Sequence, residues 1–381
     1  MTNSGFSKTR LARLHDTMAG YVERGEVPGI VTLVSRRDET HVDAIGTLSD
    51  DGSVPIQRDT IFRISSMTKP ITAVAALILV EECRLRLDDP VDEFLPELVD
   101  RQVLARINGP IDDTVPANRP ITLRDLLTFR LGYGMLMESP DEYPILRAVN
   151  ELGIGGFGPP DPDSPHGYDE WMRRLATLPL LHQPGERWLY NTGSYVLGVL
   201  ISRVTGQSLE SFFRERIFEP LGMHDTSFSV PPDKLDRLPD CYWGTSDAGT
   251  LNLFDPASGS AYSRRPVFED GSAGLVSTVD DYFAFSQMLL NNGKHGTERI
   301  LSRPSIQAMT TNQLTPEQIA TGGVLLGEGR GWGFGVGITL RRDGIAATPG
   351  RYGWDGGLGT TWYSDPAEEL IGIMLCQRLG F

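Results

Sequence analysis

A serine and a lysine, Ser66 and Lys69, stand three residues apart at the start of an apolar segment. Lys69 is one of only four lysines, because arginine fills most of the 35 Lys and Arg positions. On a helix, side chains at this spacing face the same way, which would bring the amine to the hydroxyl. An amine with a depressed pKa can take a proton from serine, whereas a guanidinium stays protonated. The pair therefore predicts a nucleophilic serine beside a lysine base.

The same spacing also has a purely structural explanation. Serine is a favoured capping residue at helix N-termini, and Lys69 would then be a solvated residue of the first turn. A cation in the first turn opposes the helix dipole, which favours the chemical interpretation. Unpaired N–H groups at the helix start would also stabilise an oxyanion formed when Ser66 attacks a carbonyl. The spacing alone leaves both interpretations open.

Composition limits the classes of partner. The formal net charge of −15 argues against nucleic acid and anionic membrane surfaces. The longest apolar run, residues 71–80, is too short to span a bilayer, and residues 1–29 lack the apolar core of a signal peptide. The three cysteines lie far apart in the sequence, so we expect them to be buried free thiols. The six histidines are also scattered and form no metal-binding motif, so we expect no metal and no cofactor. These features predict a cytoplasmic protein.

The order of the local patterns predicts an α+β fold. Apolar residues three and four apart at 6–24 indicate an amphipathic helix, and β-branched runs at 29–37 and 41–48 indicate a hairpin. A short strand at 60–66 then leads into a helix that reaches residue 83. After a helical and loop-rich middle, strand patterns return at 331–342, 358–366 and 369–378.

Strands at both ends of the chain predict one mixed, mainly antiparallel sheet flanked by helices. We expect a discontinuous sheet domain made of residues 1–80 and 245–381, with a mostly helical domain inserted at 81–244. Within the insertion, residues 137–168 are rich in Gly, Pro and Asp. A loop of this length is typical of a lid that shapes a binding pocket, although a surface excursion would have the same composition.

Four segments, in order, resemble the serine β-lactamase and penicillin-binding-protein superfamily. The nearest resemblance is to esterases built on the class C β-lactamase fold, often called family VIII carboxylesterases. It implies a β-lactamase/transpeptidase-like fold over most of the chain. The segments are FRISSMTKPITA (62–73), HQPGERWLYNTG and the helical text after it (182–228), GSAGLVSTVDDYFAFSQMLLNNG (271–293) and PGRYGWDGGLGTTWYSDP (349–366).

The resemblance implies roles for individual residues. Ser66 would be the acyl-accepting nucleophile, with Lys69 beside it. Tyr190 falls at the place of the catalytic tyrosine, and its phenol would act as a base toward Ser66 if the nearby ammonium favours phenolate. In the family's Tyr-x-Asn motif the asparagine stands where this chain has Thr192, with Asn191 one place early. Whether Asn191 or Thr192 contacts the substrate is left open.

The family's Lys/His-Thr-Gly motif reads Trp354-Asp355-Gly356 here, without a cation. In β-lactamases and penicillin-binding proteins this region helps to hold the substrate carboxylate, a role that an indole and an acid suit poorly. Trp354 better suits an apolar or neutral group, as in the esterase branch, with Asp355 and Gly356 as neighbouring substrate-binding residues. The N–H of Gly357 would be the second oxyanion donor, opposite that of Ser66. A bare turn could have the same sequence.

Together these residues predict a serine hydrolase that cleaves short-chain carboxylic esters, with a small-molecule ester as its partner. One alternative is a β-lactamase or D,D-peptidase, which the missing cation disfavours. Transfer of the acyl group to an alcohol would make the same site an acyltransferase or transesterase. A non-catalytic relative that only binds is a further alternative, and the presence of Ser66, Lys69 and Tyr190 argues against it.

Overall fold

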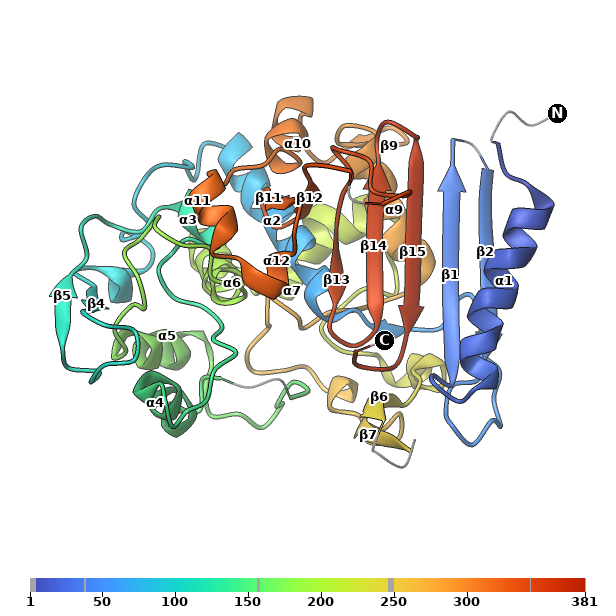
Figure 1. Cartoon of the computed structure of the whole chain (residues 1–381), viewed down its shortest axis with the longest axis horizontal. Helices are drawn as coiled ribbons and strands as arrows, with labels where there is room; N and C mark the ends of the chain where they lie inside the picture. The colour runs from blue at the N-terminus through green and yellow to red at the C-terminus, as the bar shows by residue number, and fades with distance from the viewer. Residues whose placement is uncertain (1–4, 38, 156–157, 246–249, 343, 381) are drawn as a thin grey trace.

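The computed structural model describes residues 5–37, 39–155, 158–245, 250–342 and 344–380. A seven-stranded sheet lies on one side of the molecule and a helical region on the other (Figure 1). The strand order is β11-β12-β13-β14-β15-β1-β2, and every pairing is antiparallel. The strands are β1 (Gly29–Arg36), β2 (Glu39–Gly46), β11 (Arg330–Trp332), β12 (Gly337–Thr339), β13 (Tyr352–Gly356), β14 (Thr360–Asp365) and β15 (Leu370–Cys376).

The predicted sheet built from both ends of the chain is confirmed. Strand β1 pairs with β15 along its whole length, from Ile30 opposite Cys376 to Arg36 opposite Leu370. Helices cover both faces of this pair, and six of the eight residues of β1 are buried.

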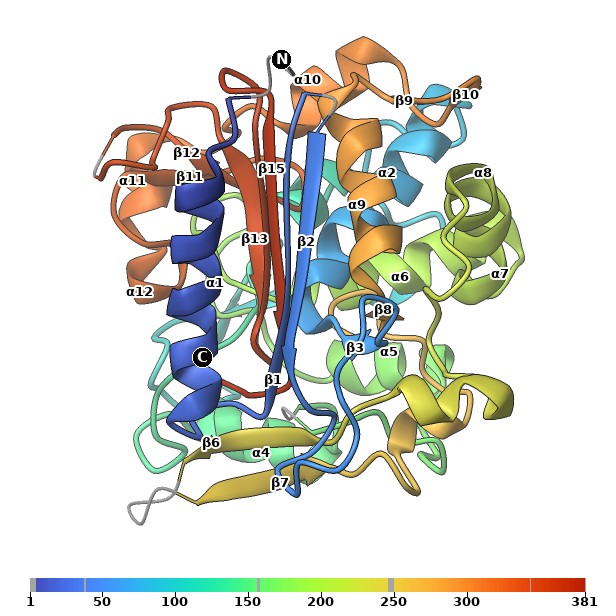
Figure 2. The same ribbon diagram turned by 90° about the vertical axis from the view of Figure 1, so that its right-hand side faces the viewer.

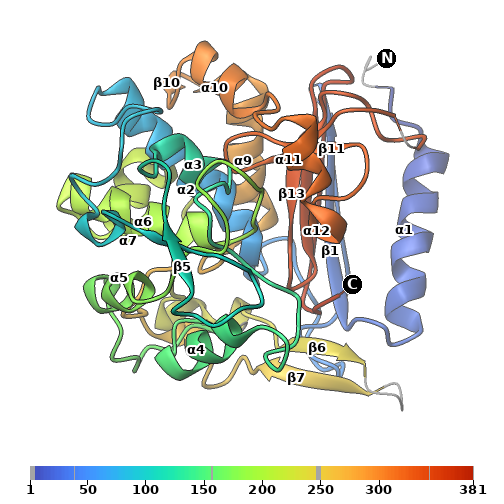
Figure 3. The same ribbon diagram turned by 60° about the vertical axis from the view of Figure 1, so that its left-hand side comes forward.

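Helices lie on both faces of the sheet (Figures 2 and 3). Helix α1 (Lys8–Glu23) covers one face, where its Met18 and Val22 pack against a buried cluster that includes Ile30 of β1. Helices α2 (Thr68–Glu81) and α9 (Val279–Leu290) lie on the opposite face. The other α-helices are α3 (Leu123–Leu127), α4 (Pro144–Leu152), α5 (Tyr168–Ala176), α6 (Thr192–Thr205), α7 (Leu209–Phe213), α8 (Glu219–Leu221), α10 (Arg303–Met309), α11 (Pro316–Ala320) and α12 (Gly323–Leu326).

Short elements connect these layers. Strand β3 (Phe62–Arg63) pairs with β8 (Val276–Ser277), and the 3-10 turn η1 (Ser65–Met67) joins β3 to α2. The remaining strand pairs are β4 (Gln102–Leu104) with β5 (Thr114–Pro116), β6 (Cys241–Thr245) with β7 (Leu251–Asp255) and β9 (Lys294–His295) with β10 (Glu298–Arg299). The further helical turns are η2 (Pro96–Leu98), the π-helical η3 (Arg214–Phe218), η4 (Pro232–Arg237) and η5 (Ala261–Ser263).

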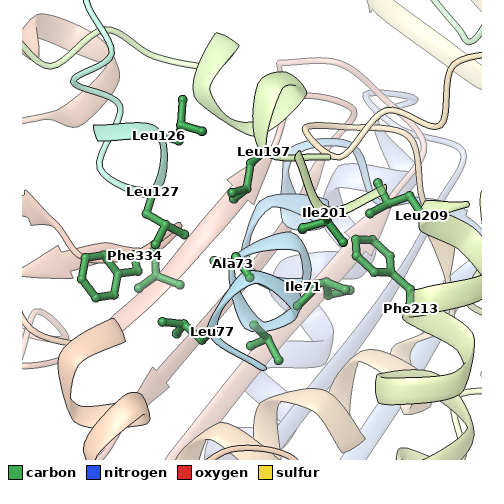
Figure 4. Close-up of a cluster of buried hydrophobic side chains, with 14 of the residues drawn as sticks. Ile71, Ala73, Leu77, Leu126, Leu127, Leu197, Ile201, Leu209, Phe213 and Phe334 are labelled. Atoms are coloured by element: carbon green, nitrogen blue, oxygen red, sulfur yellow. The ribbon is translucent and has the colours of Figure 1, made fainter. Parts of the chain in front are cut away.

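Helix α2 is the central element of the core. Twelve of its 14 residues are buried, and a helix that is buried on all sides needs apolar side chains all round. Figure 4 shows its side chains surrounded by those of α3, α6 and α7. The labelled residues are Ile71, Ala73 and Leu77 of α2, with Leu126, Leu127, Leu197, Ile201, Leu209, Phe213 and Phe334 around them. Packing on all sides of α2 therefore fixes the position of its first turn, where Lys69 lies.

The single strand predicted at 331–342 is wrong. The chain forms the hairpin β11–β12 instead, because it reverses between the two strands. The N–H of Gly333 donates to the carbonyl of Val336 at 2.8 Å, and Gly335 adopts a φ of 72°. The residue pattern of strand β13, which follows, does not by itself predict a strand.

The segment 137–168 is not a continuous loop. Residues Pro144–Leu152 form α4, which begins with proline in its first turn and ends at Gly153 in the left-handed conformation. Residues 156–157 of this segment lie outside the described residues.

The three cysteines differ in exposure. Cys241 and Cys376 are buried as expected, but the expectation for Cys83 is wrong. Cys83 lies just past the end of α2, where the chain turns with a φ of 58° and the side chain reaches the surface. Among the described residues, no helix is long and apolar enough to cross a membrane.

We expect Leu77→Ala to lower the free energy of unfolding by about 2–5 kcal/mol, because it removes buried methyl groups from the centre of the core and leaves a cavity. Urea unfolding followed by circular dichroism measures the loss. Val324→Ala, at a side chain that is 99% exposed, is the control and should stay within about 0.5 kcal/mol of the wild type. Equal losses in the two variants would contradict the central position of α2.

Candidate active site

Ser66 lies in the 3-10 turn η1, directly before α2. Its neighbour Ser65 has a φ of 47°, a left-handed conformation that is uncommon for residues other than glycine. The end of strand β13 packs closely against this turn. A Cβ atom at Gly356 would lie 2.4 Å from the carbonyl oxygen of Ile64, so only glycine permits the approach. Strained backbone of this kind gathers at functional sites.

The amine of Lys69 lies against the hydroxyl of Ser66. Its Nζ donates to Ser66 Oγ at 2.9 Å and to the carbonyl oxygen of Ser272 at 2.9 Å. The side chain is fully buried, and burial lowers the pKa of the amine to about 7, although the charge of Asp270 acts in the opposite direction. Close to neutral pH, a large fraction of Lys69 is therefore neutral and can accept a proton.

Tyr190 completes the group. Its ring centre lies 4.6 Å from Lys69 Nζ, and its hydroxyl oxygen accepts a hydrogen bond from Trp354 Nε1 at 2.6 Å. Burial raises the pKa of the phenol well above its ordinary value, and hydrogen bonds with Ser66 and Trp354 offset this only in part. Tyr190 is thus a neutral phenol at neutral pH. Burial therefore acts against the phenolate that a base role for Tyr190 requires, and the roles of Tyr190 and Lys69 in proton transfer stay predictions.

Buried aromatic rings pack around Tyr190 as a cluster, here called the aromatic wall. Trp332 and Trp354 meet edge to face with ring centres 4.6 Å apart, and Trp188 stacks on Tyr190 at 5.6 Å. Phe129 packs against both Trp332 and Tyr190. The wall is therefore apolar, and it keeps the neighbouring phenol out of water.

Asn191 links Tyr190 to helix α6. Its φ of 85° and ψ of −60° are those of a strained γ-turn, in which the N–H of Thr192 donates to the carbonyl of Tyr190 at 3.3 Å. The side chain of Asn191 forms a hydrogen bond with Tyr195. Thr192 is buried as the first residue of α6. The turn positions Tyr190, and the contact of either residue with a substrate stays a prediction.

Two of the predicted substrate-binding residues point to opposite sides of β13, because successive side chains on a strand alternate. Trp354 is buried and contacts Tyr190, whereas Asp355 is exposed. The carboxylate of Asp355 accepts hydrogen bonds from Thr361 Oγ1 at 2.5 Å and from Tyr363 Oη at 2.8 Å. The structure therefore does not bring Asp355 to Ser66.

The glycines at the end of β13 do lie beside the serine turn. Gly356 contacts the chain at Ile64, and a Cβ atom at Gly357 would lie 3.8 Å from Ser65 Oγ. The backbone after β13 thus runs beside η1, as the predicted pairing of Gly357 with Ser66 requires. Within the described part of the chain, no group of three or more His, Cys, Asp and Glu side chains could hold a metal ion.

Residues 14–381 match the family described as Beta-lactamase. The chain belongs to the β-lactamase family. It is 38% identical over 366 residues to Protein Rv1367c of Mycobacterium tuberculosis, which covers 93% of this chain and 87% of that protein. It is 30% identical over 391 residues to lovastatin esterase of Penicillium rubens, which covers 95% of this chain and 92% of that protein.

Among solved structures, EstCE1, described as a hydrolase with promiscuous acyltransferase activity, has a TM-score of 0.81 and 25% identity, covering 97% of this chain and 94% of that chain. The family resemblance and the β-lactamase/transpeptidase-like fold that the motifs implied are confirmed. The family contains serine hydrolases and acyltransferases, and its esterases are homologues of this chain.

Several parts of the site were missed from sequence. Phe129, Trp188 and Trp332 form the aromatic wall with Trp354. Of these, Trp188 could have been inferred from the sequence, because it lies two residues before Tyr190 in the same segment. The carbonyl of Ser272 carried none, because every residue has one.

The low pKa of Lys69 can be measured directly, because a chain with four lysines gives four NMR signals when the lysine ε-carbons are isotopically labelled. We expect the signal that is absent from Lys69→Met to titrate with a midpoint of about 7. An ordinary lysine titrates near about 10.4. A midpoint for Lys69 close to that ordinary value would show that burial does not lower the pKa of this amine.

Proposed function

We propose that this protein is a serine hydrolase that cleaves carboxylic esters through an acyl-enzyme on Ser66. The observation that carries the proposal is the hydrogen bond between Ser66 and a fully buried Lys69, whose pKa is about 7. A solvated lysine in the first turn of a helix, which is the structural explanation of the spacing, would be exposed and ordinarily charged.

In the proposed acylation step, neutral Lys69 accepts the proton of Ser66 while Ser66 Oγ attacks the ester carbonyl. The N–H groups of Ser66 and Gly357 stabilise the oxyanion. The phenol of Tyr190 donates its proton to the departing alkoxide and is reprotonated by the Lys69 ammonium. Water then attacks the acyl-enzyme. Tyr190 passes its proton to Lys69 and takes one from the water, and the Lys69 ammonium returns a proton to Ser66 Oγ. This releases the acid and restores Ser66.

An indole in place of a cation supports a neutral, apolar ester as substrate. Trp354 occupies the place where β-lactamases and penicillin-binding proteins carry Lys or His, and its indole N–H is already engaged by Tyr190. A substrate carboxylate would find no ion pair there. One relative, from Penicillium rubens, is named a lovastatin esterase, which supports an ester as the substrate class.

Acyl transfer to an alcohol is a second candidate function. An alcohol that replaces water would attack the same acyl-enzyme and yield a new ester. The support comes from EstCE1, a hydrolase with promiscuous acyltransferase activity.

We expect the wild type to hydrolyse p-nitrophenyl acetate and butyrate and to turn over nitrocefin slowly or not at all. Ser66→Ala and Lys69→Arg should each lower kcat/KM about a thousandfold or more, because they remove the nucleophile and the base. Absorbance assays of the released chromophore measure both. Lys234→Arg is the matched control, since Lys234 pairs with Asp225 at 2.6 Å, and it should keep full activity.

Three results would overturn parts of this proposal. An active Lys69→Arg variant would remove the lysine from the proton transfer, and a preference for nitrocefin would favour the β-lactamase alternative. Failure of a fluorophosphonate to label Ser66, together with no ester hydrolysis, would favour a non-catalytic relative that binds without reaction.

The pH profile follows from the pKa of Lys69. The neutral amine is the active form, so kcat/KM should rise with pH through a midpoint of about 7 and then level off. Below the midpoint it should fall about tenfold for each unit of pH. Initial rates with p-nitrophenyl butyrate in buffers of constant ionic strength measure the profile. A flat profile across neutral pH would contradict a lysine base.

A further inference from the structure

The segment 270–275 lies against the start of α2 and is held there by buried α2 side chains. The contacts involve three residues of one helix face, so this short segment is part of the wall around the lysine. Lys69 Nζ donates to the carbonyl of Ser272 at 2.9 Å, Thr72 Oγ1 donates to the carbonyl of Gly271 at 2.6 Å, and Thr68 Oγ1 accepts from the N–H of Leu275 at 3.2 Å.

Asp270 folds this segment back on itself. Its carboxylate accepts a hydrogen bond from the N–H of Ser272 at 2.6 Å and another from the N–H of Ala273. Its own carbonyl accepts from the N–H of Gly274 at 2.9 Å. The residue that orients the Ser272 peptide therefore also determines where the carbonyl that binds Lys69 lies.

Asp270 also acts on Lys69 through its charge. The Asp270 carboxylate raises the pKa of Lys69 against the larger effect of burial. Burial raises the pKa of Asp270 itself, and its hydrogen bonds with Ser272 and the charge of the Lys69 ammonium act in the opposite direction, so each charged group stabilises the other. The other titratable groups that face Asp270 are tyrosines from three further elements. Burial raises the pKa of each phenol, so at neutral pH they add no charge; they are Tyr168 of α5, Tyr195 of α6 and Tyr262 of η5.

We propose that Asp270 is a positioning residue for the reaction, which holds the Ser272 carbonyl against Lys69 and stabilises the ammonium that forms when Ser66 loses its proton. This inference rests on the proposed function. Asp270 then determines the pH at which Lys69 becomes a base: without the carboxylate, the amine would lose its proton at a lower pH and accept one less readily.

Glu269 supplies a matched comparison one residue away. It is buried as well, but its carboxylate pairs with Arg265 Nε at 2.8 Å and accepts from the N–H of Glu210 at 2.9 Å. It therefore stabilises a different part of the structure. Removing the charge of Glu269 therefore shows how the loss of a buried carboxylate affects the protein when that carboxylate does not act directly on Lys69.

The test compares Asp270→Asn, Asp270→Glu and Glu269→Gln with the wild type. The asparagine oxygen can still accept from Ser272, so Asp270→Asn removes charge with little change of shape. We expect the acidic limb of the kcat/KM profile and the NMR midpoint of Lys69 both to move down by about one pH unit in Asp270→Asn. Asp270→Glu should restore most of the shift, and Glu269→Gln should leave both midpoints in place.

Unchanged midpoints in Asp270→Asn would overturn the proposal, and so would an equal shift in Glu269→Gln. If Asp270→Asn fails to fold, Asp270→Ser keeps a small neutral acceptor and is read in the same way. If the wild type hydrolyses no ester, the proposed function fails, but the NMR midpoint needs no activity and still decides whether Asp270 controls Lys69.

Discussion

The removal of one lysine amine from water is the constraint on which the rest of the site depends. Helix α2 is buried on all sides, so a charge near its start is unfavourable unless neighbours stabilise it. The same burial acts in opposite ways on two groups, since it makes Lys69 easier to deprotonate and Tyr190 harder. One packed environment thereby supplies a base and an acid that can coexist at neutral pH.

Two strained backbone positions flank these groups, and both are held by the surrounding packing. Ser65 precedes the serine with a positive φ, and Asn191 follows the tyrosine in a γ-turn. Each costs free energy that only a well-packed core can offset. The close approach of Gly356 to Ile64 ties the sheet to the serine turn. The sheet, the central helix and the helical region thus meet at one place, which explains why the core and the site form a single unit.

The elements with a clear local signal in the sequence, such as regularly spaced apolar residues, were predictable. Those whose formation depends on distant partners were not. Helix α1 follows from apolar residues three and four apart, and the hairpin β1–β2 follows from two short β-branched runs. Strand β13 carries three residues of low strand propensity, Gly353, Asp355 and Gly356, and forms because β12 and β14 pair with it. That Asp355 points away from Ser66 follows from the pleat and the pairing, which spacing along the chain does not reveal. The carbonyl of Ser272 has no signature at all.

The strand order carries a consequence for biosynthesis. In the sheet, β1 lies between β2 and β15. Strand β1 is among the first elements to be synthesised, whereas β15 is among the last. During translation, one edge of the β1–β2 hairpin therefore stays unpaired while nearly the whole chain emerges, and an unpaired apolar edge invites association with other chains. Insertion of the final strands both seals this edge and brings the chain after β13 beside Ser66. A nascent chain therefore cannot have a complete site until its last strands are in place.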